Sequence, residues 1–194
     1  RFMQFLSEGA LGLTGYHSHE LQAPGMGYAA LLHHDDREEV WQAIQSAVNK
    51  HQSYQLEYRI LTREGVTRWV WERGIRVDAP ESGEVSLEGL ITDITDKKHA
   101  EEQMQLAARV FDRASEAIVV TDPNAAILTV NAAFTAVTGY TCEEALGKTP
   151  ALLKSGRHEP EFYTDMWHTL QQNGWWQGEI WNRRKNGEVY PEWL

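Results

Sequence analysis

The segment WWQGEIWNRRKNGEVYPEWL (residues 175–194) consists of two runs of strand-forming residues separated by a short polar loop. The aromatic and β-branched residues on both sides of the loop favour β-strands. The pair Asn186-Gly187 lies in the loop and is typical of a type I′ turn, which joins antiparallel strands. The segment therefore predicts a β-hairpin.

Alternate residues of a β-strand face opposite sides of the sheet. One face of the first strand carries Trp176, Gly178, Ile180 and Asn182. We expect this face to turn toward helices, so that Trp176 and Asn182 line a cup. Trp181 would then lie on the open face of the sheet, where an exposed aromatic ring suits a protein partner.

The hairpin has a counterpart earlier in the chain, because LEYRILTREGVTRWV (56–70) resembles GEIWNRRKNGEVYPEWL (178–194). Two further pairs of similar segments lie before the hairpins, in the same order in both copies. They are LTGYHSHEL (13–21) with VTGYTCEEAL (137–146), and DDREEVWQAIQSAV (35–48) with EPEFYTDMWHTLQQ (159–172). The offset is about 124 residues throughout, and similarity at a fixed spacing indicates a repeated unit. The sequence therefore predicts two copies of one domain.

The second copy shows the element pattern most clearly. Before the hairpin, the pattern predicts two short strands (116–122 and 126–131), two short helices (131–140 and 141–148) and a longer helix (160–173). Thr141 and Glu144 have capping-box spacing, and the longer helix starts with Pro160 and ends before Gly174. The apolar residues of the longer helix share one face, namely Phe162, Tyr163, Met166, Trp167 and Leu170.

The first copy agrees with this pattern. Asp35 and Glu38 have capping-box spacing in front of a helix. Its apolar face comprises Val40, Trp41, Ile44, Ala47 and Val48. A hairpin (54–61 and 67–77) and a final strand (84–95) follow. The predicted fold class is α+β, in which each domain has an antiparallel sheet of up to five strands with short helices on one face.

An amphipathic segment, residues 93–115, connects the copies. Ala100, Met104, Ala107 and Phe111 follow one another at spacings of four and three residues, which is a heptad stripe. Two interpretations remain open. The helix forms a coiled coil with a second chain, or it packs on its own domain.

Composition excludes several classes of function. A net charge of −10 repels phosphate backbones, so we expect no nucleic-acid partner. The single Cys142 excludes an internal disulfide and a cysteine-rich zinc site, and it fits a reducing compartment. There is neither an apolar run of ~20 residues nor a secretory signal, so we expect a cytoplasmic location. Nucleotide-loop and nucleophile-elbow motifs are absent, so we expect no enzyme activity in this sequence.

Taken together, these segments resemble PAS domains. The second copy shows the pattern N..F…TGY (131–140) followed by W.GE..NRRKNGE.Y (176–190), and the first shows HHDDREEVW (33–41) and GLITDITDKKHAE (89–101). The resemblance implies a five-stranded antiparallel sheet with helices cupping one face, and a role in sensing or protein contact. It also implies that Asp93, Ile94 and Thr95 join the core to an outgoing signalling helix.

The resemblance divides the chain into a first PAS domain (1–95), a linker helix (96–114) and a second PAS domain (115–194). Compared with the family, the first domain lacks its opening strand, because FMQFL (2–6) matches the second strand, and the second domain lacks its fifth strand. We therefore expect a longer polypeptide. The second copy is similar to PAS domains of cyclic-di-GMP proteins and of redox flavin sensors. The family thus implies an effector domain in the same polypeptide, a diguanylate cyclase or phosphodiesterase, or a histidine kinase.

A flavin, FAD or FMN, is the cofactor that the resemblance implies for the second domain. Asn182 matches an asparagine that contacts flavin in the light-sensing LOV branch, and Trp176 would stack on the ring. The second asparagine of that branch is Glu192 here, and its reactive cysteine is Pro150, so no thiol adduct can form. The alternative is a packed core without a ligand, in which Trp176 only fills space.

Haem and metal ions have weaker support. A haem iron needs an axial ligand that points into the cup. His168 lies opposite the apolar face of its helix, whereas His158 precedes this helix and could turn inward. His33 and His34 precede the long helix of the first copy, where a capping or loop role is expected. The eight histidines show no metal-ligand spacing, so we expect neither haem nor a metal site.

Two functions follow. In the first, the chain is a sensory input module, in which a small ligand or redox event in one cup acts on the linker helix. This function predicts a homodimer through the linker helix and the sheet faces, with Ala100, Met104, Ala107 and Phe111 in the interface. In the second, the chain is a ligand-free scaffold that mediates dimerisation or protein assembly.

Overall fold

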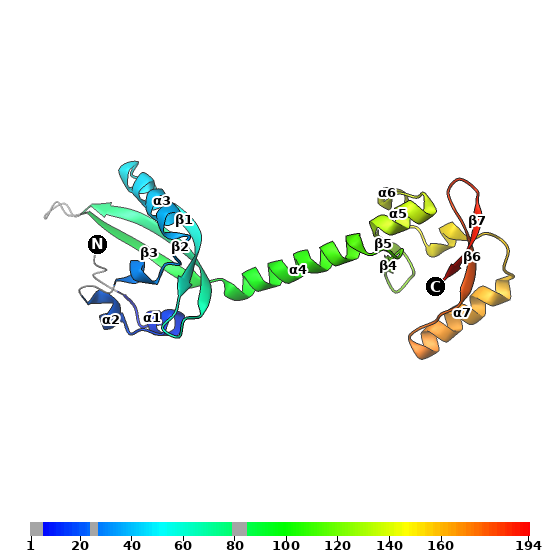
Figure 1. Cartoon of the computed structure of the whole chain (residues 1–194), viewed down its shortest axis with the longest axis horizontal. Helices are drawn as coiled ribbons and strands as arrows, with labels where there is room; N and C mark the ends of the chain where they lie inside the picture. The colour runs from blue at the N-terminus through cyan, green and yellow to red at the C-terminus, as the bar shows by residue number, and fades with distance from the viewer. Residues whose placement is uncertain (1–5, 24–26, 79–84) are drawn as a thin grey trace. The chain divides into compact units, whose positions relative to one another are not determined.

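The computed structural model describes residues 6–23, 27–78 and 85–194. The chain forms two compact units, residues 1–103 and 104–194, which agree with the two predicted copies. Figure 1 shows helix α4 (Thr95–Arg113) connecting them. The predicted linker helix, 96–114, differs from α4 by one residue at each end. Each unit is described by itself below.

The first unit contains short helices followed by an antiparallel sheet. Its helices are α1 (Gly9–Thr14), α2 (Ser18–Gln22), the 3-10 helix η1 (Tyr28–Leu31) and α3 (Arg37–Asn49). Its strands are β1 (Tyr54–Leu61), β2 (Thr67–Asp78) and β3 (Val85–Asp93), in the order β1-β2-β3. The predicted hairpin and final strand are therefore confirmed. The expected match of residues 2–6 to a strand lies mostly outside the described residues.

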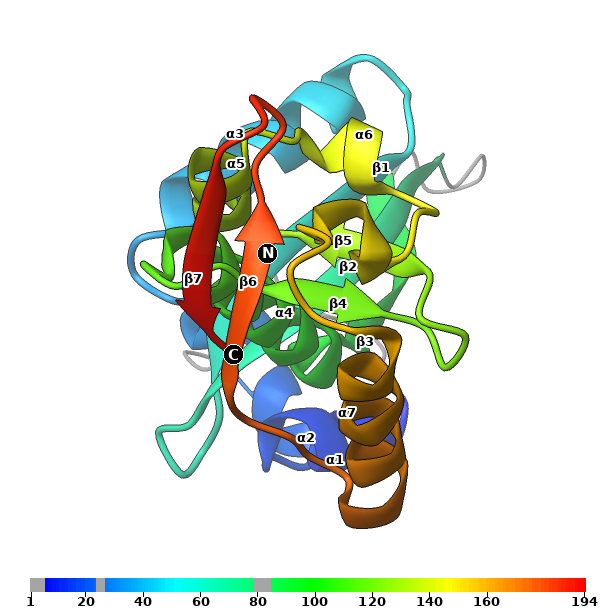
Figure 2. The same ribbon diagram turned by 90° about the vertical axis from the view of Figure 1, so that its right-hand side faces the viewer.

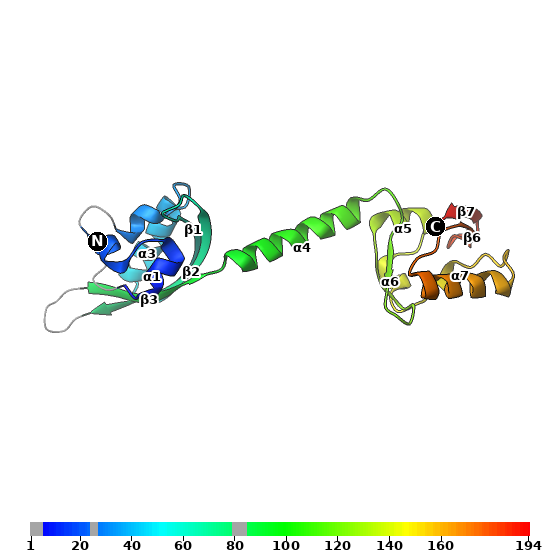
Figure 3. The ribbon, with the colours of Figure 1, turned by 90° about the horizontal axis from the view of Figure 1, so that it is seen from below.

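The helices of the first unit lie on one face of this sheet, as Figure 3 shows. The core beneath them takes residues from α1, α2, η1, α3, β1 and β2. Its most deeply buried side chains include Leu21, Tyr58, Ile60 and Val70. The alternation of side chains along a strand explains why these residues are buried, because residues 54, 56, 58 and 60 of β1 share the face that turns toward the helices.

The second unit repeats the arrangement. Its elements are β4 (Val119–Thr121), β5 (Ile127–Val130), α5 (Ala132–Thr138), α6 (Cys142–Ala145), the 3-10 helix η2 (Pro150–Leu153), α7 (Pro160–Asn173), β6 (Glu179–Arg183) and β7 (Val189–Trp193). Strands β4 and β5 form one antiparallel pair and β6 and β7 form another. Figure 2 shows β6 and β7 side by side. Capping at Thr141, Pro160 as the first residue of α7 and Gly174 after its end are all confirmed.

A Thr-Gly-Tyr corner follows the first helix of each unit. The Thr138 hydroxyl donates to the Phe134 carbonyl at 2.8 Å and accepts from the Tyr140 amide at 3.2 Å. Thr14 makes the equivalent bonds in the first unit. Gly139 has φ +79°, a left-handed conformation that glycine adopts without strain. The corner thus ends the helix with its buried hydroxyl fully bonded.

The two hairpins turn in the same way, but the type I′ prediction is wrong. In the second unit the Gly187 amide donates to the Arg184 carbonyl, and the Arg184 amide donates to Glu188. A type I′ turn needs positive φ at both central residues, and among the described non-glycine residues only His51 and Ala125 have it. Gly187, with φ +92°, instead takes the left-handed position after a turn that starts at Arg184. Asn186 uses its side chain to accept the Glu188 amide.

The start of α3 also differs from the prediction. The N-cap residue is Asp36 rather than Asp35, and its side chain makes no capping bond. The reason lies outside the helix, because both carboxylate oxygens of Asp36 bond to Arg59 of strand β1. On the predicted apolar face, Val40, Ala47 and Val48 are buried as expected, whereas Trp41 is 53% exposed.

Helix α4 exposes most of its apolar residues. Within its described length no side chain is buried, and Met104, Leu106 and Val110 are 73%, 55% and 64% exposed. Ala100 and Ala107 are also exposed, and Phe111 is half-buried. Among the described residues, no helix is long and apolar enough to cross a membrane.

Asn131 connects α4 to the core of the second unit. Its side-chain oxygen accepts the amides of Ile118 and Phe134, at 2.9 and 3.0 Å. Its side-chain nitrogen donates to the carbonyls of Phe111 and Glu116, at 3.1 and 2.9 Å. The side chain is therefore fully bonded while only 1% of the residue is exposed.

We predict that Asn131→Ala destabilises the second unit by roughly 2–4 kcal/mol. The change removes the cap of α5 and leaves buried backbone groups without partners. Urea denaturation followed by tryptophan fluorescence measures the loss. Asn173→Ala, at an exposed position at the end of α7, is the matched control and should change stability little. Equal stability of the two variants would contradict the assigned role of Asn131.

Candidate functional site

The first candidate site is the face of the β6–β7 hairpin that turns into the second unit. Ile180 and Asn182 on β6 are buried, at 6% and 7% exposure. Trp176, on the same side of the chain before β6, is half-buried, and its ring meets Phe162 edge-on at 6.0 Å. The predicted alternation along this strand is therefore confirmed. Trp181, predicted on the open face, is half-buried and stacks with the Arg157 guanidinium at 3.7 Å.

Asn182 is paired with a carboxylate inside the hairpin. Its side-chain nitrogen donates to Glu192 Oε2 at 2.7 Å, and the Tyr190 hydroxyl lies 3.4 Å from the same oxygen. Tyr190 is buried, and burial is the main cause that raises the pKa of its hydroxyl to about 12. The pair Asn182–Glu192 therefore places amide and carboxylate groups where a sheet normally presents apolar side chains.

The corresponding positions of the first unit carry apolar side chains. The bridge of Leu32 to Ile60 in the first unit corresponds to the bridge of Lys154 to Asn182 in the second, since both residues shift by 122 positions. The same shift relates Val70 to Glu192. Ile60 and Val70 are both 0% exposed. Burying a polar pair costs more than burying an apolar pair. The first unit has a carboxylate inside its hairpin as well, because Tyr54 and Tyr58 donate to Glu72, but it has none at these two positions.

Another polar group of this unit, unlike the Asn182 amide, has no hydrogen-bond partner. Among the described side chains, the Tyr163 hydroxyl is a buried donor without a hydrogen bond. Burial raises the pKa of this hydroxyl above its ordinary value. Tyr163 lies on α7, where its ring meets those of Phe162 and His158 edge-on, at 5.4 and 6.0 Å. An unsatisfied buried donor costs stability unless another group pairs with it.

These residue types are of the kind that contact a planar ligand with hydrogen-bonding edges. Trp176 and Phe162 offer ring surfaces, Asn182 offers an amide, and the Tyr163 hydroxyl offers an unused donor. A flavin has such a ring and such edges. Cys142 lies at the start of helix α6, and Pro150 starts η2 in place of the reactive cysteine of the LOV branch.

The histidines of this unit have other roles. His158 Nε2 accepts the Trp181 amide at 2.9 Å, and the imidazole stacks on Phe162 at 3.9 Å. The nitrogen that would ligate an iron is therefore bonded to the backbone. His168 is exposed on α7, as predicted.

The second candidate site is the junction between β3 and α4, where the predicted relay residues lie. Asp93 accepts the Thr95 amide at 2.9 Å and forms an ion pair with Arg68 at 3.3 Å. The Ile94 amide donates to the Trp69 carbonyl at 2.9 Å, and Thr95 Oγ1 accepts the Trp69 amide at 3.0 Å. All three relay residues therefore connect the start of α4 to β2.

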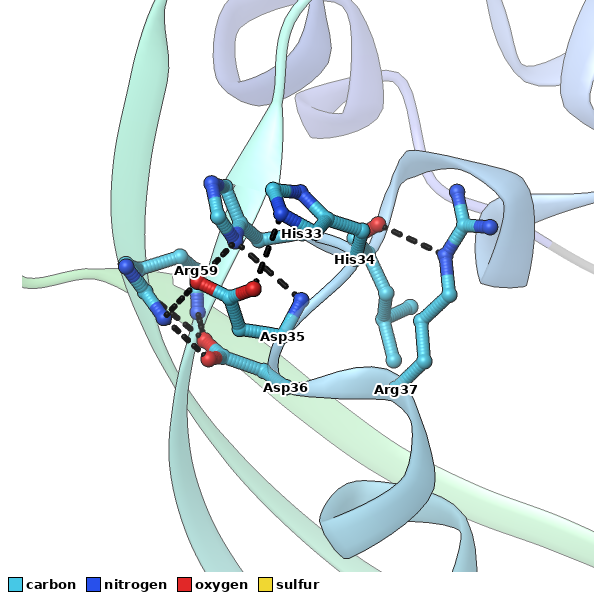
Figure 4. Close-up of polar contacts among 7 residues, drawn as sticks. His33, His34, Asp35, Asp36, Arg37 and Arg59 are labelled. Carbon is cyan, nitrogen blue, oxygen red and sulfur yellow. Dashed lines mark hydrogen bonds and ion pairs between the residues drawn. The ribbon is translucent and has the colours of Figure 1, made fainter.

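A charged network that sequence reasoning missed extends this junction to the edge of the sheet. Arg59 on β1 bonds to Asp36 through its backbone amide and its guanidinium (Figure 4). The hydrogen bonds of Arg59 lower the pKa of the Asp36 carboxyl. The Arg59 guanidinium also lies 5.7 Å from the Trp69 ring, and Lys98 of α4 lies 5.2 Å from it. The partners lie far apart in the sequence, so no local spacing indicated them.

Lys98 completes the network on the helix side. Its ammonium lies 2.6 Å from Glu57 Oε2, and this hydrogen bond is the main cause that lowers the pKa of Glu57 and raises that of Lys98. The first turn of α4 is thus held on the sheet by backbone bonds, an ion pair and a cation–π contact.

Comparison with known proteins agrees with this geometry. A family model described as "PAS fold" matches residues 4–91, and one described as "PAS domain" matches residues 115–192. A nitrogen fixation regulatory protein of Klebsiella oxytoca is 40% identical over 81 residues, which cover 42% of this chain and 16% of that protein. A methyl sulfide methyltransferase-associated sensor of Methanosarcina acetivorans is 31% identical over 113 residues, which cover 57% of this chain and 11% of that protein.

Among solved structures, a sensory box histidine kinase/response regulator from Burkholderia thailandensis is similar, with 30% identity and a TM-score of 0.46. The match covers 57% of this chain and 82% of that one. The chain spans less than a fifth of the length of the curated relatives it matches. With both family matches in the predicted order, the chain belongs to the PAS family and carries two PAS domains in tandem.

Proposed function

We propose that this chain is the sensory input module of a signalling protein, and that it relays the state of its PAS domains through α4. Its matched relatives include a regulatory protein and a sensor, which supports this class of function. The observation that carries the proposal is the attachment of α4. Its first turn is bonded to the sheet of the first domain at Trp69 and Glu57, while Asn131 of the second domain holds the Phe111 carbonyl near its other end.

Such an arrangement can transmit a change in either domain. A signal needs two states that differ in their affinity for the ligand. A shift of β2 displaces the Trp69 backbone groups that bond to Ile94 and Thr95, and therefore displaces the start of α4. The proposal also includes an effector that receives the signal. This effector is a cyclic-di-GMP enzyme or a histidine kinase in the same polypeptide.

The proposal includes a homodimer through α4. Ala100, Met104, Ala107 and Phe111 lie on one side of the helix, and Met104 is 73% exposed. Val110 lies beside this stripe and is also exposed, which widens the apolar side of the helix. A second copy of the same helix offers a matching heptad seam that covers these residues.

We expect Met104→Glu to convert the dimer to a monomer, because two carboxylates would face each other in the seam. Analytical ultracentrifugation measures the change, and the dissociation constant should rise by at least about tenfold, equivalent to ~1.4 kcal/mol. Gln105→Glu adds the same charge on the opposite side of α4 and is the matched control. A chain that is monomeric before mutation, or a dimer that tolerates Met104→Glu, would refute the interface.

We further infer that the second domain binds a flavin, which would supply redox chemistry to the sensor. Trp176 would face the ring, Asn182 would bond to its polar edge, and the Tyr163 hydroxyl would gain a partner. The support is the polar pair Asn182–Glu192 at the position where the first domain has Ile60 and Val70. A ligand-free scaffold would not need that pair.

The purified chain should therefore show flavin absorbance, or take up added FMN or FAD with quenching of the flavin fluorescence. Asn182→Leu should weaken binding by roughly tenfold or more, because it removes the amide that would bond to the ring edge and leaves Glu192 with only the longer bond from Tyr190. Asn173→Leu, at the exposed end of α7, serves as the control. A colourless chain that takes up neither flavin would favour the scaffold function.

A further inference from the structure

The loop before α3 contains a group of metal-ligating side chains. Among the described residues, one set of three or more His, Cys, Asp or Glu side chains has its ligand atoms within 4.8 Å of one another, namely His33, His34 and Asp35. Sequence reasoning gave the two histidines a loop or capping role. The structure adds a geometry that spacing alone did not show, because both imidazole rings turn toward the carboxylate that follows them (Figure 4).

We propose that His33, His34 and Asp35 bind one divalent transition-metal ion, of the class represented by Zn²⁺. Asp35 Oδ2 lies 3.5 Å from His33 Nδ1, and Asp35 Oδ1 lies 2.8 Å from His34 Nε2. Ligand atoms that share a tetrahedral zinc ion are about 3.4 Å apart, given bonds of about 2.0–2.2 Å. The three groups therefore need only small side-chain rotations to converge on one ion.

The loop permits those rotations. The side chains of His34 and Asp35 are 76% and 56% exposed, and the contact of the His34 ring is with His33, at 4.4 Å between ring centroids. His33 is 16% exposed and gives the site a fixed wall. The Asp35 amide donates to His33 Nδ1 at 3.4 Å, which is a long bond that an ion can replace. Two imidazoles and one carboxylate leave a fourth position for water, as in open zinc sites.

Charge near the site also permits a cation. Arg59 is the nearest positive group, and its guanidinium lies 3.5 Å from Asp35 Oδ2. However, its principal partner is Asp36, which binds it at both carboxylate oxygens. Arg37 bonds to the carbonyls of Leu32 and Ala30, at 3.0 and 3.2 Å, and Figure 4 shows it apart from the Asp35 carboxylate. Asp36 thus offsets the charge of Arg59, which leaves Asp35 available to the ion.

The position of the site gives such an ion a route to the outgoing helix. Arg59 contacts both Asp35 and the Trp69 ring, and Lys98 of α4 contacts the same ring. A metal ion bound to Asp35 would weaken the attraction between the Asp35 carboxylate and the Arg59 guanidinium. This step rests on the proposed sensory function, whereas binding of the ion does not depend on it.

Isothermal titration of the tag-free chain with ZnCl₂ tests the site. We expect one ion per chain, and His34→Asn and Asp35→Asn should each weaken binding by at least about tenfold. Both positions are exposed, so the variants should keep their fold, which circular dichroism verifies. His168→Asn, an exposed histidine of the second domain, and Cys142→Ser, the single thiol, are controls that should bind zinc as the unmodified chain does.

Failure to bind zinc would overturn the proposal. So would zinc binding that survives both His34→Asn and Asp35→Asn, or that is lost in Cys142→Ser. These results leave the sensory function standing, because calorimetry records binding without any signalling output. Conversely, a monomeric chain that binds zinc through these residues would contradict the dimer and retain the metal site.

Discussion

The same backbone hydrogen bond joins the end of the first helix to the hairpin turn in both domains, and it helps to fix the cup. The Thr14 carbonyl accepts the Arg63 amide at 2.9 Å, and the Thr138 carbonyl accepts the Lys185 amide at 2.8 Å. Each carbonyl is available because the glycine after it takes a left-handed conformation and turns the chain out of the helix. A Cβ at Gly15 would lie 3.1 Å from the Arg63 side chain, so the approach itself also favours glycine. This bond acts together with the bridges of Leu32 to Ile60 and of Lys154 to Asn182, which also hold the hairpins in place.

The two domains use this common backbone for different chemistry. Position 36 and position 158 both accept the amide of the edge strand, but Asp36 adds an ion pair with Arg59, whereas His158 stacks on Phe162. Within the hairpin, the apolar residues of the first domain give way to the polar pair of the second. Both domains nevertheless hold a carboxylate inside the hairpin, since Tyr54 and Tyr58 donate to Glu72 in the first and Asn182 donates to Glu192 in the second. In the proposed function, the two domains of one fold would thus give two separate inputs to one helix.

Local patterns in the sequence account for much of this fold. Both hairpins, the linker helix and the Thr141–Glu144 cap were predictable because each depends on residues close together in the chain. The turn type at Asn186-Gly187 was a local error, whereas the error at the start of α3 occurred where distant residues compete. Asp35 had the right spacing for a cap, yet the helix starts after Asp36, because Arg59 binds that carboxylate. The network of Arg59, Trp69 and Lys98 joins three elements, so no local pattern reveals it. In the candidate site, alternation alone placed Asn182 inside, but not its bond to Glu192.

The attachment of α4 also determines what kind of change the module can transmit. Thr95 and Lys98 hold the first turn on the sheet, whereas residues 99–110 are exposed and make no buried contact within the described chain. A helix of 19 residues is stiff over its length of about 28 Å. Since isolated helices are marginal in water, packing of an apolar stripe normally stabilises them. Rotation or displacement of the first turn would therefore alter the contacts of the whole stripe at once. In the proposed dimer, a small change at Trp69 would thus change how the two copies of α4 pack.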